Sequence, residues 1–270
     1  DIRGMLPSVL FTPDDLKLVK GSAEKRRAAI DLVGVQLSRT YAKIRSDYTK
    51  IIRCKNRLFK EDSVDRPILA SWNINLEEVG SSFLFHRVRL FSTLVEEVMK
   101  VHRELVENES LSISYYPSWE KDYDSPEPAF QKALGEYSRD ELKVFLEREI
   151  ERRNEDEIIR RSCLVGPHRD EIVFYLNGRD ARKYGSQGQV RTIALAWKIA
   201  EVRVISRLND QQPILLLDDV MSELDEMRRS ALMQTIDGNI QTVITTTNLQ
   251  YFEPSFVKTA KVVDLEELLS

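Results

Sequence analysis

Long apolar runs and an excess of positive charge are missing from this sequence of 270 residues, and cysteine is scarce. No apolar stretch approaches the roughly twenty residues that span a bilayer, and no signal peptide opens the chain, so we expect no membrane contact and a cytoplasmic location. Only Cys54 and Cys163 are present, far apart in sequence, which argues against a disulfide framework. Because the net charge is −4, any contact with DNA must come from local basic patches.

The most informative segment is a short aliphatic run that ends in two acids. Pro213 precedes the aliphatic residues Ile214 to Leu217, and Asp218 and Asp219 follow them directly. A run this short predicts a strand buried on both faces of a parallel sheet. Since ligands of open α/β sheets bind outside the carboxyl ends of the strands, the two carboxylates are candidates for metal or nucleotide chemistry. A plain strand end with solvated acids is the alternative.

A loop that contains glycine, Gly185–Gln189, precedes this strand and leads into a segment of helical period. The apolar residues of that segment are Val190, Ile193, Ala194, Trp197, Ala200, Val204 and Leu208. The first N–H groups of a helix lack partners within the helix, and together with the helix dipole they attract phosphate. The pattern therefore indicates a phosphate-binding turn, with an ordinary turn and helix N-cap as the alternative.

The order and spacing of these segments resemble the second half of an ABC-type ATPase. In that superfamily a signature loop and its helix precede the Walker B strand, a D-loop and a further strand; here 222–225 reads SELD and 241–248 reads QTVITTTN. The segments YGSQGQVRT (184–192), LLLDDVMSELD (215–225) and VGPHRDEIVF (165–174) are similar to the RecF family of bacterial recombination mediators. The resemblance implies an α/β fold, an ABC-type ATPase head lobe of the P-loop NTPase type with an inserted, mainly helical domain.

The resemblance also implies roles for named residues, with ATP and Mg²⁺ as cofactors. Asp218 would reach Mg²⁺ through water, and Asp219 stands where most ABC ATPases carry the catalytic glutamate that polarises the attacking water. Asp225 would couple paired sites, and Thr246 stands where many family members carry a switch histidine. The loop would bind the γ-phosphate of a nucleotide held by the other protomer, through Ser186, Gln187, Gly188 and Gln189.

The partners that the resemblance implies are DNA at single-strand/double-strand junctions, a second copy of the chain on ATP binding, and the proteins RecR and RecO. One ATPase motif is not in the sequence, because none of the ten glycines is followed by lysine. The missing Walker A loop, Gly-x-x-x-x-Gly-Lys-[Ser/Thr], holds the β- and γ-phosphates. In RecF it lies near the N-terminus, upstream of the matching segments, so we expect that this chain alone does not hydrolyse ATP. Another SMC-like head and a non-catalytic interaction module stay open as alternatives.

Two long helices and several short strands are expected around the central segment. Apolar periodicity predicts one helix over about 22–60 and another from near Phe83, with an irregular stretch over 61–82, which together form an antiparallel helical arm. Alternation predicts strands at 8–11, at 111–116 and before the Asn177–Gly178 hairpin turn, and a further helix covers 129–161. We place the domain boundaries at 1–21 for the end of an N-terminal ATPase lobe, 22–157 for the helical insertion and 158–270 for the C-terminal ATPase lobe.

A basic cluster is expected near the end of the first helix. Its members are Arg53, Lys55, Arg57 and Lys60. The cluster is either a solvated arm tip or a contact with a phosphate backbone.

Overall fold

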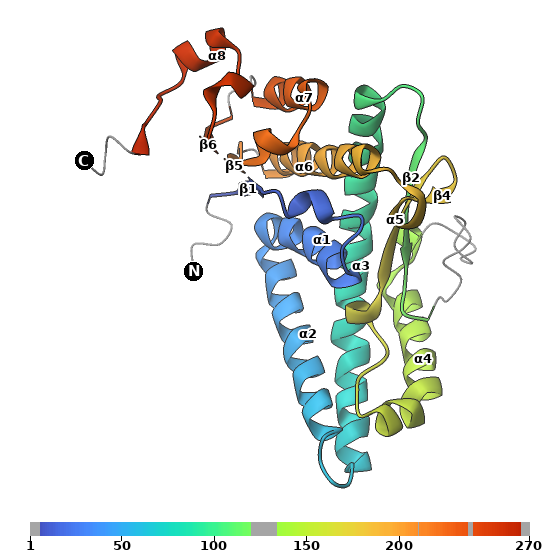
Figure 1. The fold of residues 1–270 in the computed structure, drawn as a ribbon. Coiled ribbons are helices and arrows are strands. Elements are labelled where there is room, and N and C mark those ends of the chain that lie inside the picture. The colour runs from blue at the N-terminus through green and yellow to red at the C-terminus, as the bar shows by residue number, and fades with distance from the viewer. Residues whose placement is uncertain (1–5, 120–133, 210, 237–239, 266–270) are drawn as a thin grey trace.

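The computed structural model describes residues 6–119, 134–209, 211–236 and 240–265. Its helices are α1 (Ala23–Leu37), α2 (Arg39–Leu58), α3 (Arg66–Leu105), α4 (Arg139–Arg160), α5 (Ala181–Tyr184), α6 (Gln187–Asn209), α7 (Glu226–Ile236) and α8 (Pro254–Thr259). Its strands are β1 (Ser8–Phe11), β2 (Leu111–Tyr116), β3 (Glu171–Leu176), β4 (Arg179–Asp180), β5 (Ile214–Asp218) and β6 (Thr242–Thr245). The two sheets and α6 form a head, and α2, α4 and the adjoining part of α3 extend from it as a long arm (Figure 1).

The strand that ends in two acids lies at the centre of a parallel sheet of order β1-β5-β6. Leu215 and Leu217 are buried in the same core as the apolar residues of α6. Ile214 and Leu216, which point to the other face, are only half-buried, so the expectation of a strand buried on both faces was wrong in that respect. The parallel strands and the helix packed on them confirm the predicted α/β class.

The second sheet, β2-β3-β4, is antiparallel and joins the head to the arm. The predicted hairpin turn is present: Asn177 has φ 50° and Gly178 has φ 76°, the left-handed pair that a tight hairpin needs. The ring of Phe174 on β3 packs edge-on against Trp197 of α6 at a centroid distance of 5.9 Å. The second sheet and α6 therefore pack into the same hydrophobic core.

The single helix expected over 22–60 is broken at Ser38, and that prediction was wrong. Ser38 has extended backbone angles, and its Oγ accepts a hydrogen bond from the Tyr41 N–H at 3.2 Å, which makes it the N-cap of α2. Gly34 allows the turn, because a Cβ at that position would lie 2.6 Å from the Tyr41 ring. Helices α1 and α2 consequently pack against each other at this corner.

Helix α3 begins at Arg66, well before Phe83, so the irregular stretch expected over 61–82 is mostly helical. Asp65 caps it by accepting the Ile68 N–H at 3.0 Å, and Pro67 is tolerated in the first turn. The added turns bury apolar side chains against α2 and α4 in a second core at the arm. The helix predicted over 129–161 is observed only from Arg139, as α4; Leu134–Glu136 forms a 3-10 turn instead, and 129–133 lies outside the described residues.

The basic cluster expected at the arm tip loses one member to the interior. Lys55 and Glu157 are both fully buried and form an ion pair at 2.6 Å. The other Glu157 oxygen accepts the backbone N–H groups of Leu164 and Val165. The ion pair of Lys55 and Glu157 thus links α2, α4 and the segment that returns to the head, and Lys55 is not available to a ligand.

In the described part of the chain, no helix combines the length and the apolar character needed to cross a bilayer.

Candidate functional site

The two acids at the carboxyl end of β5 have different environments. Asp218 is exposed, and its Oδ1 accepts a hydrogen bond from the Thr245 hydroxyl at 2.7 Å. Asp219 is half-buried, and its Oδ1 has no hydrogen-bond partner among the described residues. The Asp219 backbone is left-handed, with φ 47° and ψ 27°, a conformation that costs a non-glycine residue roughly 1–2 kcal/mol. A strained backbone and an orphaned buried oxygen at a strand end are typical of a functional site.

Thr245 contacts both acids, and it precedes Thr246, the residue that the resemblance places at the switch position. The Asp219 N–H donates to the carbonyl and the hydroxyl oxygens of Thr245 at 3.2 and 3.1 Å. The Thr246 hydroxyl lies one residue further on and is engaged with the backbone of Asn248 at 3.1 and 3.2 Å. Parallel register places Asp218 opposite Thr245, so a register argument could have found this residue.

The acidic end of β5 fits a magnesium ion that water and phosphate complete. Asp218 is exposed and Asp219 offers an unpartnered oxygen. No group of three or more His, Cys, Asp or Glu residues suited to a metal occurs among the described residues. Mg²⁺ is typically coordinated by one or two carboxylates together with water and nucleotide phosphates. The carboxylates of Asp218 and Asp219 match this coordination.

The Gly185–Gln189 loop closes on itself at the start of α6. The Ser186 Oγ accepts the Gln189 N–H at 3.2 Å, and the Gln189 Oε1 accepts the Ser186 N–H at 2.9 Å, a reciprocal cap of the helix. Ser186 and Gln187 are exposed. A Cβ at Gly188 would meet only Arg228 Nη2 at 3.4 Å and Ser186 Oγ at 4.0 Å. Packing therefore does not require glycine there, and the open space lets a ligand approach the first turn of α6.

Arg228 joins this loop to Asp225. The Asp225 carboxylate accepts the Arg228 N–H at 3.0 Å and pairs with its guanidinium. The same guanidinium donates to the Gly188 carbonyl at 2.9 Å and to the Thr192 hydroxyl at 2.7 Å. The structure thus brings Asp225 and the loop together, whereas no hydrogen bond links Asp218 or Asp219 to the loop within the described ranges.

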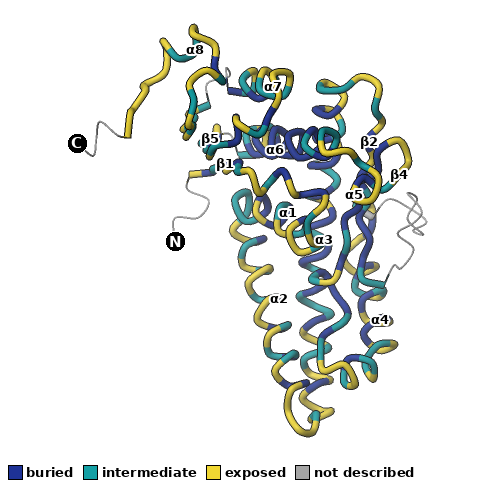
Figure 2. Tube along the Cα trace, viewed as in Figure 1, coloured by how far each residue is buried: buried dark blue, intermediate teal, exposed yellow. Residues whose placement is uncertain are grey.

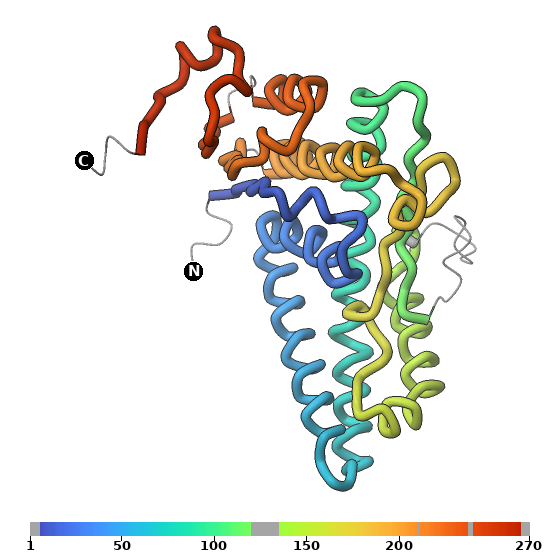
Figure 3. Tube along the Cα trace, in the orientation of Figure 1, coloured from blue at the N-terminus to red at the C-terminus, as the bar shows by residue number. Residues whose placement is uncertain are grey.

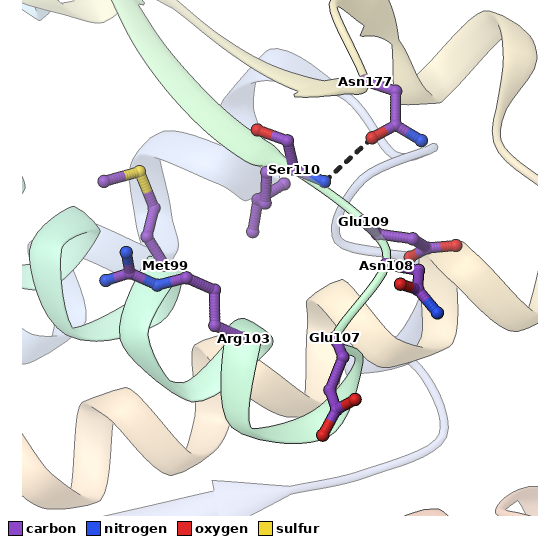
Figure 4. Close-up of a pocket in the computed structure, with 8 residues that line it drawn as sticks. Met99, Arg103, Glu107, Asn108, Glu109, Ser110 and Asn177 are labelled. Carbon is purple, nitrogen blue, oxygen red and sulfur yellow. Dashed lines mark hydrogen bonds between the residues drawn. The ribbon is translucent and has the colours of Figure 1, made fainter.

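A pocket of about 410 Å³ lies between the end of α3, the corner before β2 and Asn177, and sequence reasoning missed it (Figure 4). Glu109 lines the pocket and accepts a hydrogen bond from the Gln189 side chain at 2.8 Å. His102 is fully buried beside it, with Nε2 3.7 Å from the Glu109 carboxylate, and burial lowers its pKa. Glu109 therefore holds the amide of Gln189 with its oxygen toward Ser186.

In the Gly166–Asp170 segment, Arg169 is exposed, but His168 and Asp170 are held in hydrogen bonds to the protein and have a structural role. Burial raises the pKa of Asp170 to about 6 and lowers the pKa of His168 to about 3. Asp170 accepts the Tyr115 hydroxyl at 2.5 Å, and His168 contacts the Tyr48 hydroxyl at 2.6 Å and the Cys163 carbonyl at 3.2 Å. A neutral His168 ring satisfies both contacts, as a donor to the carbonyl and an acceptor from the phenol.

Comparison with known proteins gives a consistent result. The DNA replication and repair protein RecF of Gloeothece citriformis is 37% identical over 284 residues, which cover 98% of this chain and 71% of that protein. The protein of the same name from Bacillus subtilis is 37% identical over 251 residues, covering 91% of this chain and 65% of its own length. A solved structure described as the recombination mediator protein RecF with ATPrS in the RecFOR pathway matches with a TM-score of 0.80 at 27% identity, covering 93% of this chain and 65% of that one.

A second solved structure, described as RecF with ATP in the same pathway, gives a TM-score of 0.79 at 27% identity. No protein-family model matches the chain. The chain spans about two thirds of the length of these relatives, between 65% and 71% in the three comparisons above. Identity at this level across nearly the whole chain, on the same fold, shows that it belongs to the RecF family of DNA replication and repair proteins.

Proposed function

We propose that this chain acts in recombinational DNA repair and replication as the signature-bearing part of an ATP-dependent DNA-binding protein. The observation that carries the proposal is the buried, unpartnered Oδ1 of Asp219 on a left-handed backbone, beside exposed Asp218 at the end of a central parallel strand. Ligands of such sheets bind at this end. Relatives of known structure are described as complexes with ATP or ATPrS, which supports a nucleotide as the ligand.

The two acids take different roles in this proposal. Asp218 holds Mg²⁺ through water while its position is fixed by the Thr245 hydroxyl. Asp219 orients the attacking water with the oxygen that has no protein partner. Thr246, which follows Thr245 in the chain, senses the γ-phosphate. Hydrolysis needs these positioning and charge effects more than covalent chemistry by the protein.

The loop serves a second nucleotide. Ser186, Gln187, Gly188 and Gln189 bind the γ-phosphate of ATP held by another copy of the chain, so that ATP draws two copies into a homodimer. Asp225 couples the two sites, since Arg228 connects it to the Gly188 carbonyl. The exposed first turn of α6 supports this role, because it presents N–H groups and a positive dipole end outward.

The wider function follows from the family. We propose binding to single-strand/double-strand junctions in gapped DNA, cooperation with RecR and RecO in loading recombinase, and a cytoplasmic location. We also retain the three-part division at 1–21, 22–157 and 158–270, with the middle part as the insertion.

The test compares the full-length gene product with single substitutions. We expect MgATP to shift the wild-type protein from monomer to dimer in light scattering. Asp218→Asn should abolish this Mg²⁺-dependent shift, and Asp219→Asn should preserve the dimer while slowing hydrolysis by about 10² or more. Asp140→Asn, at an exposed acid in the first turn of α4, is the control. Dimerisation and turnover that are indifferent to both Asp218 and Asp219 would overturn the proposal.

A non-catalytic interaction module that retains the signature half is the second candidate. Both candidates predict that the 270-residue chain alone shows no ATP turnover. Turnover by that chain, abolished by Asp218→Asn, would contradict this expectation. The module is distinguished by a full-length product that neither binds ATP nor dimerises with it.

A further inference from the structure

One side of α2 carries a continuous row of positive charge. The row consists of five exposed cations: Arg39, Lys43, Lys50, Arg53 and Arg57. At about 100° per residue, their spacings keep all five within a sector of about 80°. The opposite side holds the buried residues of the helix, Tyr41 and Tyr48 among them. The row therefore faces away from the buried side of α2. Helix α2 itself forms one outer edge of the arm (Figures 1 and 2).

Four of these five cations have no acidic partner among the described residues. Of the five, only Lys50 has an acidic partner in the described part of the chain, Asp47 at 3.4 Å on the exposed surface. Asp47 is also the only acid on α2. The neighbouring acid of α1, Asp31, is buried and engaged with Arg87 and Arg45.

The remaining arm helices differ in this respect. On α4, Arg139 and Lys143 both pair with Glu78 of α3, and Arg152 and Arg153 pair with Glu149. These helices mix both signs, as solvated helices usually do. A row of largely unpaired cations, as on α2, is thus not a general property of the arm, in a chain whose net charge is −4.

We infer that the exposed face of α2 binds the phosphate backbone of duplex DNA. From Arg39 to Arg57 the row extends about 27 Å at 1.5 Å per residue, so its cations can contact several phosphates along one backbone. Phosphate contacts of this kind fix position without reading sequence. The inference rests on the proposed DNA-binding function and names the surface that carries it.

The cationic face of α2 favours duplex over single-stranded DNA because it carries no exposed aromatic residue. Surfaces for single strands combine cations with aromatic rings on which bases stack. The aromatic residues of α2, Tyr41 and Tyr48, are buried on the opposite side, and between the cations stands only the small polar Ser46. The face offers charge and no stacking platform.

The test is a titration of a short fluorescent duplex with the 270-residue chain at several salt concentrations. The triple variant Lys50→Gln, Arg53→Gln, Arg57→Gln should bind on the order of tenfold to a hundredfold more weakly. The slope of log K against log salt should become shallower by roughly two to three, because each lost phosphate contact removes about 0.9. Replacing the same residues by Arg, Lys and Lys keeps the charge and should retain binding.

The matched control removes the same three charges from α4, as Arg148→Gln, Arg152→Gln, Arg160→Gln, at exposed positions of that helix. It should bind like the wild-type chain. Equal binding by the two triple variants would overturn the inference and leave the proposed function standing. A wild-type chain that binds no duplex would overturn the inference, while the proposed function is tested separately by the response of the full-length product to MgATP. A loss confined to a single-stranded oligomer of equal length would overturn the assignment to duplex. Circular dichroism and the unfolding midpoint confirm that each variant is folded.

Discussion

At the scale of single residues, Asp219 shows how local strain and function meet. Its left-handed backbone turns the chain out of β5, and the Thr245 carbonyl and hydroxyl fix the turn by accepting its N–H. Aspartate tolerates this conformation better than most residues. The turn leaves Oδ1 without a partner among the described residues, at a cost of about 1–3 kcal/mol for a buried polar group. A fold selected only for stability would place glycine or asparagine there.

His168 gives the chain a pH-dependent stability. Because burial lowers its pKa from 6.5 to about 3, the neutral ring stabilises the fold above pH 6.5, and this contribution is lost as pH falls through about 3. Asp170 acts in the opposite sense, since burial raises its pKa from 3.8 to about 6. Its contribution is present below pH 3.8 and is lost as pH rises through about 6.

We therefore expect the variant His168→Gln to lose the acid-sensitive part of stability. As the pH falls from 6.5 to about 4, the free energy of unfolding of this variant should stay level or rise. Over the same range, His168 lowers the free energy of unfolding of the wild-type chain by up to about 1.4 kcal/mol per pH unit. Urea unfolding at several pH values measures this. His86→Gln, at a half-buried position, is the control and should change the pH profile less. A variant profile that parallels the wild type would show that His168 does not titrate as stated.

At the scale of elements, Arg228 is the link between α7 and the start of α6. Arg228→Ala removes donors to the Gly188 carbonyl and the Thr192 hydroxyl and should destabilise the chain by about 1–3 kcal/mol. Amide hydrogen exchange should accelerate over 186–192. The neighbouring Arg229 stacks on Tyr251 at 5.0 Å and does not touch the loop, so Arg229→Ala should leave exchange at 186–192 unchanged. Equal protection in the two variants would contradict the link.

Elements with strong local signals could be predicted from the sequence, and those set by packing could not. The short strands and the Asn177–Gly178 turn were predicted because alternation and turn chemistry are local. The first half of α3 was missed because Asn73, Asn75 and Gly80 are poor helix formers. Contacts override this propensity: a Cβ at Gly80 would lie 2.9 Å from Leu146, so the glycine is what lets α4 approach.

The candidate site likewise has residues that the sequence identifies and residues that only the fold reveals. Its acids and its loop are contiguous in sequence and could be identified there. Thr245 and Glu109 act from other elements, through strand register and through the corner before β2. Only the fold brings them to the site.

At the scale of the whole molecule, the buried pair of Lys55 and Glu157 ties the arm to the chain that returns to the head. Lys55→Met should cost about 3–5 kcal/mol, because it leaves the Glu157 charge buried without its partner. The double variant with Glu157→Gln should recover part of this loss, since the amide oxygen still accepts the backbone N–H groups. Chemical unfolding measures the cycle, with exposed Lys50→Met as a control expected within about 0.5 kcal/mol of wild type. A double variant no more stable than Lys55→Met would contradict the pairing.

Helix α3 runs unbroken for 40 residues, packing on α6 near one end and ending beyond α2 and α4 at the other (Figure 3). Its length is about 60 Å. If α6 and α3 tilt together by about 10°, the remote end swings by about 10 Å, because a stiff rod multiplies rotation by its length. A small rotation of α6 in the head, such as nucleotide binding would cause, would thus produce a much larger displacement at the far end of the arm.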